Sequence, residues 1–465
     1  MFNRFSPEEF LITNELGYYY FIDEINFQKL VEERYSEIPE EILNELKEQL
    51  FIYDSSELLF TEKAFHEYRK SKQYLFAGTC LHIFVLTNGC NMNCVYCQAQ
   101  DNDHPDKGMM DFKTAEKAVE IALQSPAYSL DFEFQGGEPL LNYPVIKHIV
   151  EYTEEHKNDK TISFSIVTNT LALNEEMMEF FFKHKISIST SLDGDRELHN
   201  CNRPSRDGTG TFSQVIENIH RMQEMGISVG VIQTTTRMSL KYSCQIVDTY
   251  LKNGLTTVFI RPLTPLGYAK EHWDIIGYSP CEFLDFYKDT LLYILKMNTD
   301  TRIMREGHAT IFLNKILGHN SGNYMELRSP CGAGIGQVAY YYDGRIYTCD
   351  EARMLGEMGN DAFKIGNVAK DTYQSIMESR CNKITCQASI LETIPQCCDC
   401  AYHPYCGVCP VVNLATDGNI YAREVHNYRC QIYKGMLDLL FDLIQRDGEE
   451  LRIFKRWICG GVRNE

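Results

Sequence analysis

Three cysteines, Cys90, Cys94 and Cys97, lie within eight residues of one another. They come directly after an apolar run at 83–87, so we expect them on a loop that follows a strand. Three thiolates at this spacing can hold one face of an iron–sulfur cluster, which normally takes four cysteine ligands. The fourth position is therefore supplied by a cysteine elsewhere or left open to a small molecule. A zinc site, or cysteines that share no role, is the alternative.

A glycine-containing turn follows the next β-rich run, at 130–135. Its residues are Gln135, Gly136, Gly137, Glu138 and Pro139. Paired glycines let the backbone approach a ligand closely. The exposed amide and carbonyl groups of such a turn could hold an ammonium and a carboxylate. A turn without a ligand is the alternative.

Seven further cysteines occupy the C-terminal third of the chain in an ordered pattern: Cys331, Cys349, Cys397, Cys400, Cys406, Cys409 and Cys430. The start of the chain lacks the pattern of a signal peptide, which predicts a cytoplasmic protein. In that reducing compartment the 18 cysteines of the chain are more often metal ligands than disulfides. These spacings therefore predict metal, with a zinc ribbon as the alternative to iron–sulfur clusters.

The elements that must position these residues alternate between strand and helix. Strands are predicted near 82–87, 130–135, 161–168, 185–191, 227–236 and 257–262, with helices at 114–124, 142–156, 175–184 and 214–225. Six such units predict an α/β fold with parallel strands and crossover helices, closed partly into a barrel. Active sites on barrels lie at the C-terminal ends of the strands, where both motifs fall.

The remaining segments divide the chain. Residues 1–75 open with a hairpin, 10–13 and 18–22, followed by helices after Asp23 and Pro39, and form a small module. The barrel occupies 76–270, a helical bridge 271–325, the cysteine-rich domain 326–435, and a C-terminal helix and tail 436–465.

Composition excludes some functions. The chain has 465 residues, 44% of them hydrophobic, and a net charge of -19. This acidic balance argues against a nucleic-acid surface, which needs a basic footprint. No apolar run approaches the roughly 18 residues of a membrane span, so we expect no membrane contact.

The cysteine and glycine motifs resemble those of radical S-adenosylmethionine (SAM) enzymes. The resemblance implies a partial (β/α)6 TIM-like barrel and a [4Fe-4S] cluster whose open iron is chelated by SAM. It implies that reductive cleavage of SAM releases a 5'-deoxyadenosyl radical, which abstracts hydrogen from the substrate. The turn at 135–139 would hold the methionine amino group, and Asn169 and Ser191 would meet the ribose and carboxylate. Ordinary turn or cap roles are the alternative for these last two residues.

The C-terminal cysteines resemble a SPASM domain, which carries two auxiliary clusters, expected here to be [4Fe-4S]. Carried over, the pattern assigns Cys397, Cys400, Cys406 and Cys430 to one cluster, and Cys331, Cys349 and Cys409 to the other. Two residues rather than the usual three precede Cys409, and Gln337 stands where some members have a further cysteine. The second cluster therefore has an open iron, for a substrate thiolate or for a spare thiol. The spare thiols are Cys381, Cys386 and Cys398.

Asp350 directly follows Cys349. In related sulfatase maturases the aspartate at this place is the catalytic base, which must lie within hydrogen-bond reach of the proton that it takes. A role in tuning the cluster from outside its ligand set is equally open.

The sequence at 133–142, 191–204 and 349–356 is similar to the His-Xaa-Ser system branch of these peptide maturases. That branch implies a ribosomally made precursor peptide as substrate, a reductant such as flavodoxin or ferredoxin, and a companion maturase. Residues 1–75 resemble a winged-helix leader-recognition element, which binds a peptide by adding a strand. A cap on the next domain is the alternative for this segment. A sulfatase-type maturase making formylglycine, or a non-catalytic iron–sulfur electron carrier, is the alternative for the whole chain.

Overall fold

The computed structural model describes residues 1–53, 58–99, 108–319, 325–421 and 427–459. Its centre is a ten-stranded sheet, in which the strands predicted for the barrel run parallel and in chain order. They are β4 (Leu81–Val85), β5 (Ser129–Gln135), β6 (Thr161–Val167), β7 (Ser187–Ser191), β8 (Val229–Thr234) and β9 (Thr257–Arg261). The expected α/β fold with a partial barrel is confirmed.

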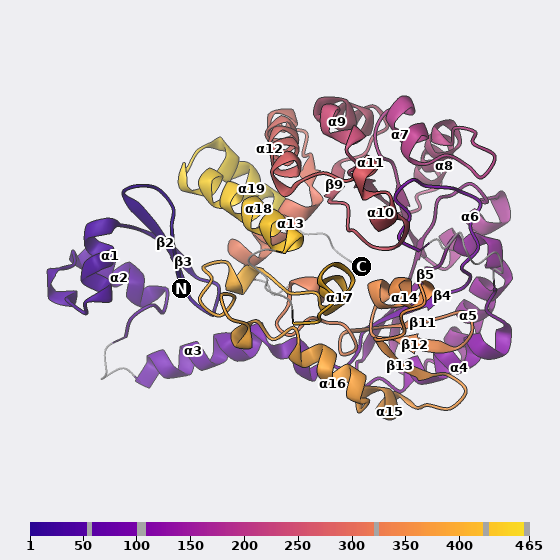
Figure 1. Ribbon diagram of the computed structural model, residues 1–465, viewed down its shortest axis with the longest axis horizontal. Helices are drawn as coiled ribbons and strands as arrows, with labels where there is room; N and C mark the ends of the chain where they lie inside the picture. Colours follow the sequence, from indigo (N-terminus) through magenta and orange to yellow (C-terminus); the bar gives the residue numbers. More distant parts are fainter. Residues whose placement is uncertain (54–57, 100–107, 320–324, 422–426, 460–465) are drawn as a thin grey trace.

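Crossover helices pack against the outside of these strands, at the right of Figure 1. Those expected from the sequence are α4 (Phe112–Leu123), α5 (Tyr143–His156), α6 (Glu175–Lys183) and α8 (Phe212–Glu224). Side-chain caps fix where they begin, as Asp111 accepts a hydrogen bond from the backbone amide of Thr114 at α4. Two more, α7 (Arg196–Asn202) and α9 (Ser243–Lys252), were not predicted; residues 235–242, which include a 3-10 turn at Met238–Lys241, connect β8 to α9.

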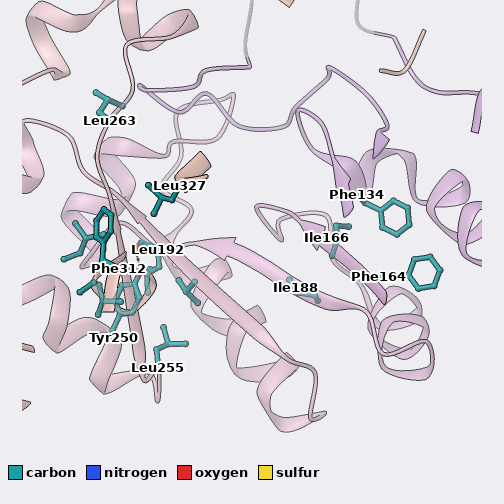
Figure 2. Close-up of a cluster of buried hydrophobic side chains, with 14 of the residues drawn as sticks. Phe134, Phe164, Ile166, Ile188, Leu192, Tyr250, Leu255, Leu263, Phe312 and Leu327 are labelled. Atoms are coloured by element: carbon teal, nitrogen blue, oxygen red, sulfur yellow. Dashed lines mark hydrogen bonds between the residues drawn. The ribbon is translucent and has the colours of Figure 1, made fainter. Parts of the chain in front are cut away.

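Side chains alternate between the two faces of each strand, so that one face packs in the core and the other faces the site. In β5, Leu130, Phe132 and Phe134 are buried, whereas Glu133 and Gln135 point to the opposite face and line a cavity. The buried face joins rings of neighbouring strands, with Phe134 and Phe164 stacked at a centroid distance of 6.2 Å. Figure 2 shows this core continuing from these rings to Phe312 and Leu327, which come from outside the barrel.

The sheet continues into the cysteine-rich segment. β11 (Gln337–Tyr340) pairs in parallel with β4, and β12 (Arg345–Tyr347) and β13 (Lys364–Asn367) extend the sheet in antiparallel pairing. At the other edge β10 (Arg305–Glu306) pairs with β9. The barrel and the cysteine-rich segment therefore share one sheet. The helices of this segment are α14 (Asp350–Glu357), α15 (Tyr373–Met377), α16 (Arg380–Gln387) and α17 (Pro410–Asp417).

Longer helices cover the side between the barrel and the N-terminal module. They are α12 (Pro280–Met297), α13 (Gly307–Ile316), α18 (Tyr428–Gln445) and α19 (Glu449–Cys459), preceded by the short α10 (Gly267–Glu271) and α11 (Trp273–Ile276). The expectation of a tail after α18 is wrong for 449–459, because Leu451, Phe454 and Trp457 repeat at helical spacing and are buried. Residues 460–465 lie outside the described part of the chain. No helix in the described residues is both long and apolar enough to span a membrane.

The N-terminal module, residues 1–48, projects from the body in Figure 1. Its three strands are β1 (Phe2–Arg4), β2 (Glu9–Thr13) and β3 (Tyr19–Asp23), followed by α1 (Glu24–Val31) and α2 (Glu40–Glu48). The expected hairpin is β2–β3, and Asp23 caps α1 through the backbone amide of Asn26. The module docks on the cysteine-rich segment, where Thr13 Oγ1 donates to the Ala401 carbonyl at 2.7 Å. α3 (Leu58–Ser71) leads from it to the barrel.

His82 sits in the seam between β4 and β11. Its Nδ1 lies 3.0 Å from Tyr340 Oη and its Nε2 3.3 Å from the Thr79 carbonyl oxygen. Burial lowers the pKa of His82 to about 3. The unfolded chain takes up a proton near pH 6.5 whereas the folded chain does not, so stability falls as pH drops below that value.

We expect His82→Gln to remove part of this pH dependence. Between pH 7 and pH 5 the wild type loses about 2 kcal/mol through this group, and the variant loses correspondingly less. Urea midpoints followed by circular dichroism at the two pH values measure the difference. His220→Gln, at an exposed position of α8, is the control. Equal pH dependence in wild type and His82→Gln would contradict the assignment.

Candidate active site

A cavity of about 500 Å³ lies at the C-terminal ends of the barrel strands. All six strand ends contribute to it, from the loop after β4 to Arg261 at the end of β9. Of the residues predicted from the sequence, it is lined by Cys90, Cys94, Cys97, Gln135, Gly136, Gly137, Asn169, Ser191 and Asp350. The fold thus brings together residues up to 260 positions apart, as a barrel's loop end does.

The loop that carries the three cysteines is held by the segment after α7. The backbone amides of Asn93 and Val95 donate to the carbonyls of Pro204 and Asn202, at 2.8 and 3.0 Å. Beneath the loop Tyr96 donates to Asp193 at 2.9 Å and accepts from Arg203 at 2.6 Å, all three side chains being buried. A buried, paired charge fixes geometry because breaking the pair leaves a charge without compensation.

Gly136 and Gly137 let two loops touch. The Gly137 amide donates to the Thr87 carbonyl and the Glu138 amide to the Gly89 carbonyl, both at 2.8 Å. A Cβ atom would lie 2.4 Å from the Thr87 oxygen at position 136, and 2.3 Å from the Gly89 oxygen at position 137. The close approach predicted for a ligand is thus also an approach to the loop that leads to Cys90.

Glu138 and Pro139, both predicted to bind cofactor, do not line the cavity; both are buried. Instead, the Glu138 carboxylate accepts from Thr168 Oγ1 at 2.6 Å, from the Asn169 amide at 2.8 Å and from the Leu140 amide at 3.0 Å. It ties the loops after β5 and β6 together. Glu138 therefore affects a ligand indirectly, by holding Thr168 and Asn169 in the cavity wall.

Asn169 and Ser191 do line the cavity. Asn169 Nδ2 donates to Asn91 Oδ1 at 2.7 Å and lies 3.7 Å from Cys90 Sγ, so this side chain also steadies the cysteine loop. Ser191 ends β7 and shares the cavity wall with Ser189 and Thr234 from the same face of the sheet.

The auxiliary cysteines gather in two places, as the resemblance groups them. Cys331, Cys349 and Cys409 are buried in one small core, and burial together with the neighbouring Cys409 thiol raises the pKa of Cys331. In the second place, burial and the thiols of Cys430 and Cys400 raise the pKa of Cys406 to about 12.

Two more cysteines, Cys397 and Cys381, have contacts that show where they lie. A turn in which the Cys400 amide donates to the Cys397 carbonyl, at 3.2 Å, places Cys397 next to the second group. Among the spare thiols, Cys381 Sγ donates to the Ala362 carbonyl at 3.2 Å.

Within the described residues no three His, Cys, Asp or Glu side chains converge on one point where a single metal ion would sit. The first cysteine group fits an iron–sulfur cluster in its chemistry. Three thiols face one cavity, and burial raises the pKa of Cys94 to about 12, so a bound cation would be needed to hold them as thiolates.

Asp350 reaches the cavity from the cysteine-rich segment. It begins α14, for which Cys349 is the N-cap, with Cys349 Sγ accepting from the Ala352 amide at 3.4 Å. Asp350 Oδ1 accepts from Arg353 Nε at 2.7 Å, and Arg353 also donates to Gln135 Oε1 at 3.4 Å. One chain of contacts therefore joins an auxiliary cysteine to the glycine turn.

Besides Asp350, six charged residues that were given no committed role line the cavity: Arg203, Arg261, Glu326, Glu351, Glu133 and Arg353. Arg261 Nη2 lies 3.7 Å from Glu351, and Arg429 pairs with Glu326 at 2.5 Å. The run Asn202-Arg203-Pro204 was a signal for Arg203, because it falls within the stretch 191–204 that resembles the peptide maturases. Glu326 lies five residues before Cys331 but belongs to no motif, so no local signal marked it.

Residues 84–240 match the family model of the Radical SAM superfamily. Among curated proteins, MJ0907 of Methanocaldococcus jannaschii, an uncharacterized protein, is 30% identical over 190 residues. The chain spans 64% of that relative's length, and the match covers 41% of this chain. The cysteine-type anaerobic sulfatase-maturating enzyme of Clostridium novyi is 24% identical over 69% of this chain and 84% of that enzyme.

Two solved structures share the fold. Native anSMEcpe with bound AdoMet covers 81% of this chain and 99% of its own, with a TM-score of 0.67 and 20% identity. Streptococcus suis SuiB bound to the precursor peptide SuiA covers 90% of this chain and 96% of its own, with a TM-score of 0.55 and 16% identity. Both matches extend well beyond the barrel.

The structure predicts that Glu138→Gln weakens the hydrogen bonds that hold the loops after β5 and β6 together, without removing a side chain from the cavity wall. Either orientation of the amide places an NH2 group against a donor, the Asn169 amide or the Thr168 hydroxyl and Leu140 amide. A buried donor left without an acceptor costs about 1–3 kcal/mol. We expect a lower urea midpoint and weaker SAM binding by calorimetry. Glu179→Gln, exposed on α6, should change neither. Unaltered SAM affinity in Glu138→Gln would count against the positioning role.

Proposed function

We propose that this chain, in which residues 84–240 form a radical SAM domain, is a maturase that modifies a ribosomally made precursor peptide. One observation carries the proposal. A single cavity is lined both by the barrel's cysteine loop and by Asp350, which follows the auxiliary cysteine Cys349. Such a cavity puts a substrate between a site of hydrogen abstraction and a second redox centre.

Cys90, Cys94 and Cys97 would hold a [4Fe-4S] cluster, and Gln135, Gly136, Gly137, Asn169 and Ser191 would hold SAM against it. When bound, the cluster and SAM together supply the hydrogen-abstracting chemistry. The contacts of the protein itself position this chemistry. The Tyr96–Asp193–Arg203 group fixes the cysteine loop from below, and Glu138 fixes the loops on either side of the cavity.

Asp350 is proposed as the base that takes a proton from the substrate. Its Oδ1 already accepts from Arg353, which leaves Oδ2 to receive the proton. The same contact orients the carboxylate toward the cavity that Asp350 lines. The competing role is to tune an auxiliary cluster through Cys349, and the two are separated by experiment below.

The auxiliary cysteines would hold two further clusters, with Cys397, Cys400, Cys406 and Cys430 on one and Cys331, Cys349 and Cys409 on the other. The set of Cys331, Cys349 and Cys409 adjoins Asp350, which lines the cavity, and leaves one position for a substrate thiolate. Cys381, one of the spare thiols, is engaged with a backbone carbonyl, which favours the substrate for that position.

The N-terminal module is proposed to bind the precursor peptide by strand addition at β3. β1 meets Cys400 at one edge of the three-stranded sheet, which leaves β3 as the other edge. A groove of about 500 Å³ follows that edge, lined by residues 18–21 together with Leu317 and His319. A free strand edge beside apolar pockets is the arrangement that peptide addition uses. SuiB, which shares the fold, has been solved with its precursor peptide.

Within this class we place the chain in the His-Xaa-Ser branch. A sulfatase-type maturase is the second candidate, favoured by Asp350 and by the relative in Clostridium novyi. The products differ: formylglycine carries a carbonyl that reacts with hydrazides, whereas a crosslinked peptide loses two hydrogens without one. A non-catalytic iron–sulfur carrier, the third candidate, is disfavoured by a glycine turn that lines the same cavity as the cysteine loop.

The proposed function predicts two products. Anaerobically reconstituted protein with SAM and dithionite should release 5'-deoxyadenosine, measured by liquid chromatography. Co-expression with a candidate His-Xaa-Ser precursor peptide should yield a modified peptide, in which tandem mass spectrometry locates the modification. Release of no 5'-deoxyadenosine would reject the enzyme, and a hydrazide-reactive peptide would move the assignment to the second candidate.

Asp350→Asn separates the two roles of that residue. If Asp350 is the base, modified peptide should fall by about a hundredfold or more, because loss of a general base typically costs that much. 5'-Deoxyadenosine should still form, since hydrogen abstraction precedes the proton transfer. Asp285→Asn, exposed on α12, is the control. A normal yield of product in Asp350→Asn would exclude the base and leave the tuning role.

A further inference from the structure

We propose that the outer face of α3 and the turn after it docks an acidic one-electron carrier protein of the flavodoxin type. The exposed side chains of this segment are Lys63, Phe65, Tyr68, Arg69, Lys70, Leu75 and Phe76, which lie on more than one side of the helix and together are called here the α3 face. The proposal rests on the proposed function, because it assigns a route for electrons to one auxiliary cluster. It also names a surface that the substrate peptide does not need.

The α3 face has the make-up of an interface. Phe65 is 65% exposed and Phe76 81% exposed, with Tyr68 and Leu75 also exposed. Phe65, Tyr68 and Arg69 follow one side of the helix at spacings of three and four. Large apolar side chains grouped on a surface and rimmed by polar ones mark a binding site for another protein.

The charge of the α3 face runs against that of the whole chain. The chain carries a net charge of -19, so an acidic protein is repelled over most of its surface. Residues 58–76 contain Lys63, Arg69, Lys70 and Lys72 against only Glu62 and Glu67. Arg69 and Lys70 are exposed and form no ion pair in the described part of the chain. Complementary charge steers encounter and selects the partner, and here it selects an acidic one.

The α3 face also borders a cavity that a predicted cluster ligand lines. A small cavity of about 80 Å³ is lined on one side by Tyr68, Lys72 and Tyr74, and on the other by His403 and Cys406. Tyr68 is both part of the α3 face and part of this cavity wall. His403 is buried, and neither of its ring nitrogens has a hydrogen-bond partner in the described residues. This small cavity lies between Tyr68 of the α3 face and Cys406.

The position of α3 leaves room for such a partner. In Figure 1 the helix runs along the lower border of the molecule, between the N-terminal module and the cysteine-rich segment. Its Tyr68 side approaches His319, which also lines the groove beside β3, whereas its exposed side chains point away from that groove's strand edge into solvent. A carrier on the α3 face would give up one electron and reduce the auxiliary cluster by one electron, with no proton or group transferred.

The test uses the double variant Arg69→Glu with Lys70→Glu in the full-length, reconstituted protein. Its control is Lys183→Glu with Lys252→Glu, which makes the same charge change at exposed positions on α6 and α9. Binding of purified flavodoxin is measured by calorimetry at low and high salt. A second measurement follows reduction of the clusters by stopped-flow, with reduced flavodoxin and, separately, with dithionite.

We expect the α3 variant to weaken flavodoxin binding by roughly tenfold or more at low salt, and the control variant to change it by much less. Reduction by flavodoxin should slow in the α3 variant, whereas reduction by dithionite, which needs no docking surface, should not. Equal binding by the two variants would overturn the proposal. The proposal would also be overturned if the α3 variant still bound flavodoxin but lost binding of the precursor peptide, or lost self-association, because the α3 face would then serve that other contact.

These outcomes are distinguishable from failure of the proposed function. That function is tested by the release of 5'-deoxyadenosine from SAM with dithionite as reductant. Neither SAM nor dithionite needs the α3 face. A protein that cleaves SAM but binds flavodoxin equally well in both variants would reject the docking site alone.

Discussion

The site depends on the contact between two loops, in which the Gly136–Gly137 backbone lies against the carbonyls of Thr87 and Gly89. Any side chain at either glycine would collide with those oxygens, so this contact admits only glycine at 136 and 137. It brings the loop after β5 onto the start of the cysteine loop after β4. Glu138, directly after the pair, extends the contact to the loop after β6. Three successive strand ends are thereby fixed relative to one another before any ligand arrives, which is what a preorganised site requires.

The second constraint is the shared sheet. Because β11 pairs in parallel with β4, the cysteine-rich segment has its position set by backbone hydrogen bonds rather than by a flexible linker. β12 then leads directly to Cys349 and α14, whose first residue is Asp350. Arg353 completes the connection by touching both Asp350 and Gln135. The acid at the cavity and the glycine turn are therefore joined by direct contacts, and a molecule that enters the cavity meets both.

The sequence was most informative where chemistry and local structure coincide. The six barrel strands and most crossover helices were predictable because alternation and helical periodicity are local signals. The cysteine motif, which follows β4, identified β4 as the first strand of the barrel. α7 and α9 were missed because each lies between segments with a stronger periodic pattern. Glu138 was expected at the ligand, but its three donors lie on a loop about 30 residues further along the chain and on its own turn, a pairing that no sequence pattern shows. Arg261, Glu326 and Glu351 meet only through the tertiary fold.

The central claim is that Cys90, Cys94 and Cys97 hold a cluster that binds SAM. The most direct measurement is electron paramagnetic resonance of the reduced, anaerobically reconstituted protein with and without SAM. The account predicts a [4Fe-4S] signal that shifts when SAM is added. In Cys94→Ala the shift should disappear while the auxiliary signals remain. A wild-type spectrum that SAM leaves unchanged, or purified protein that contains zinc and no iron, would contradict it.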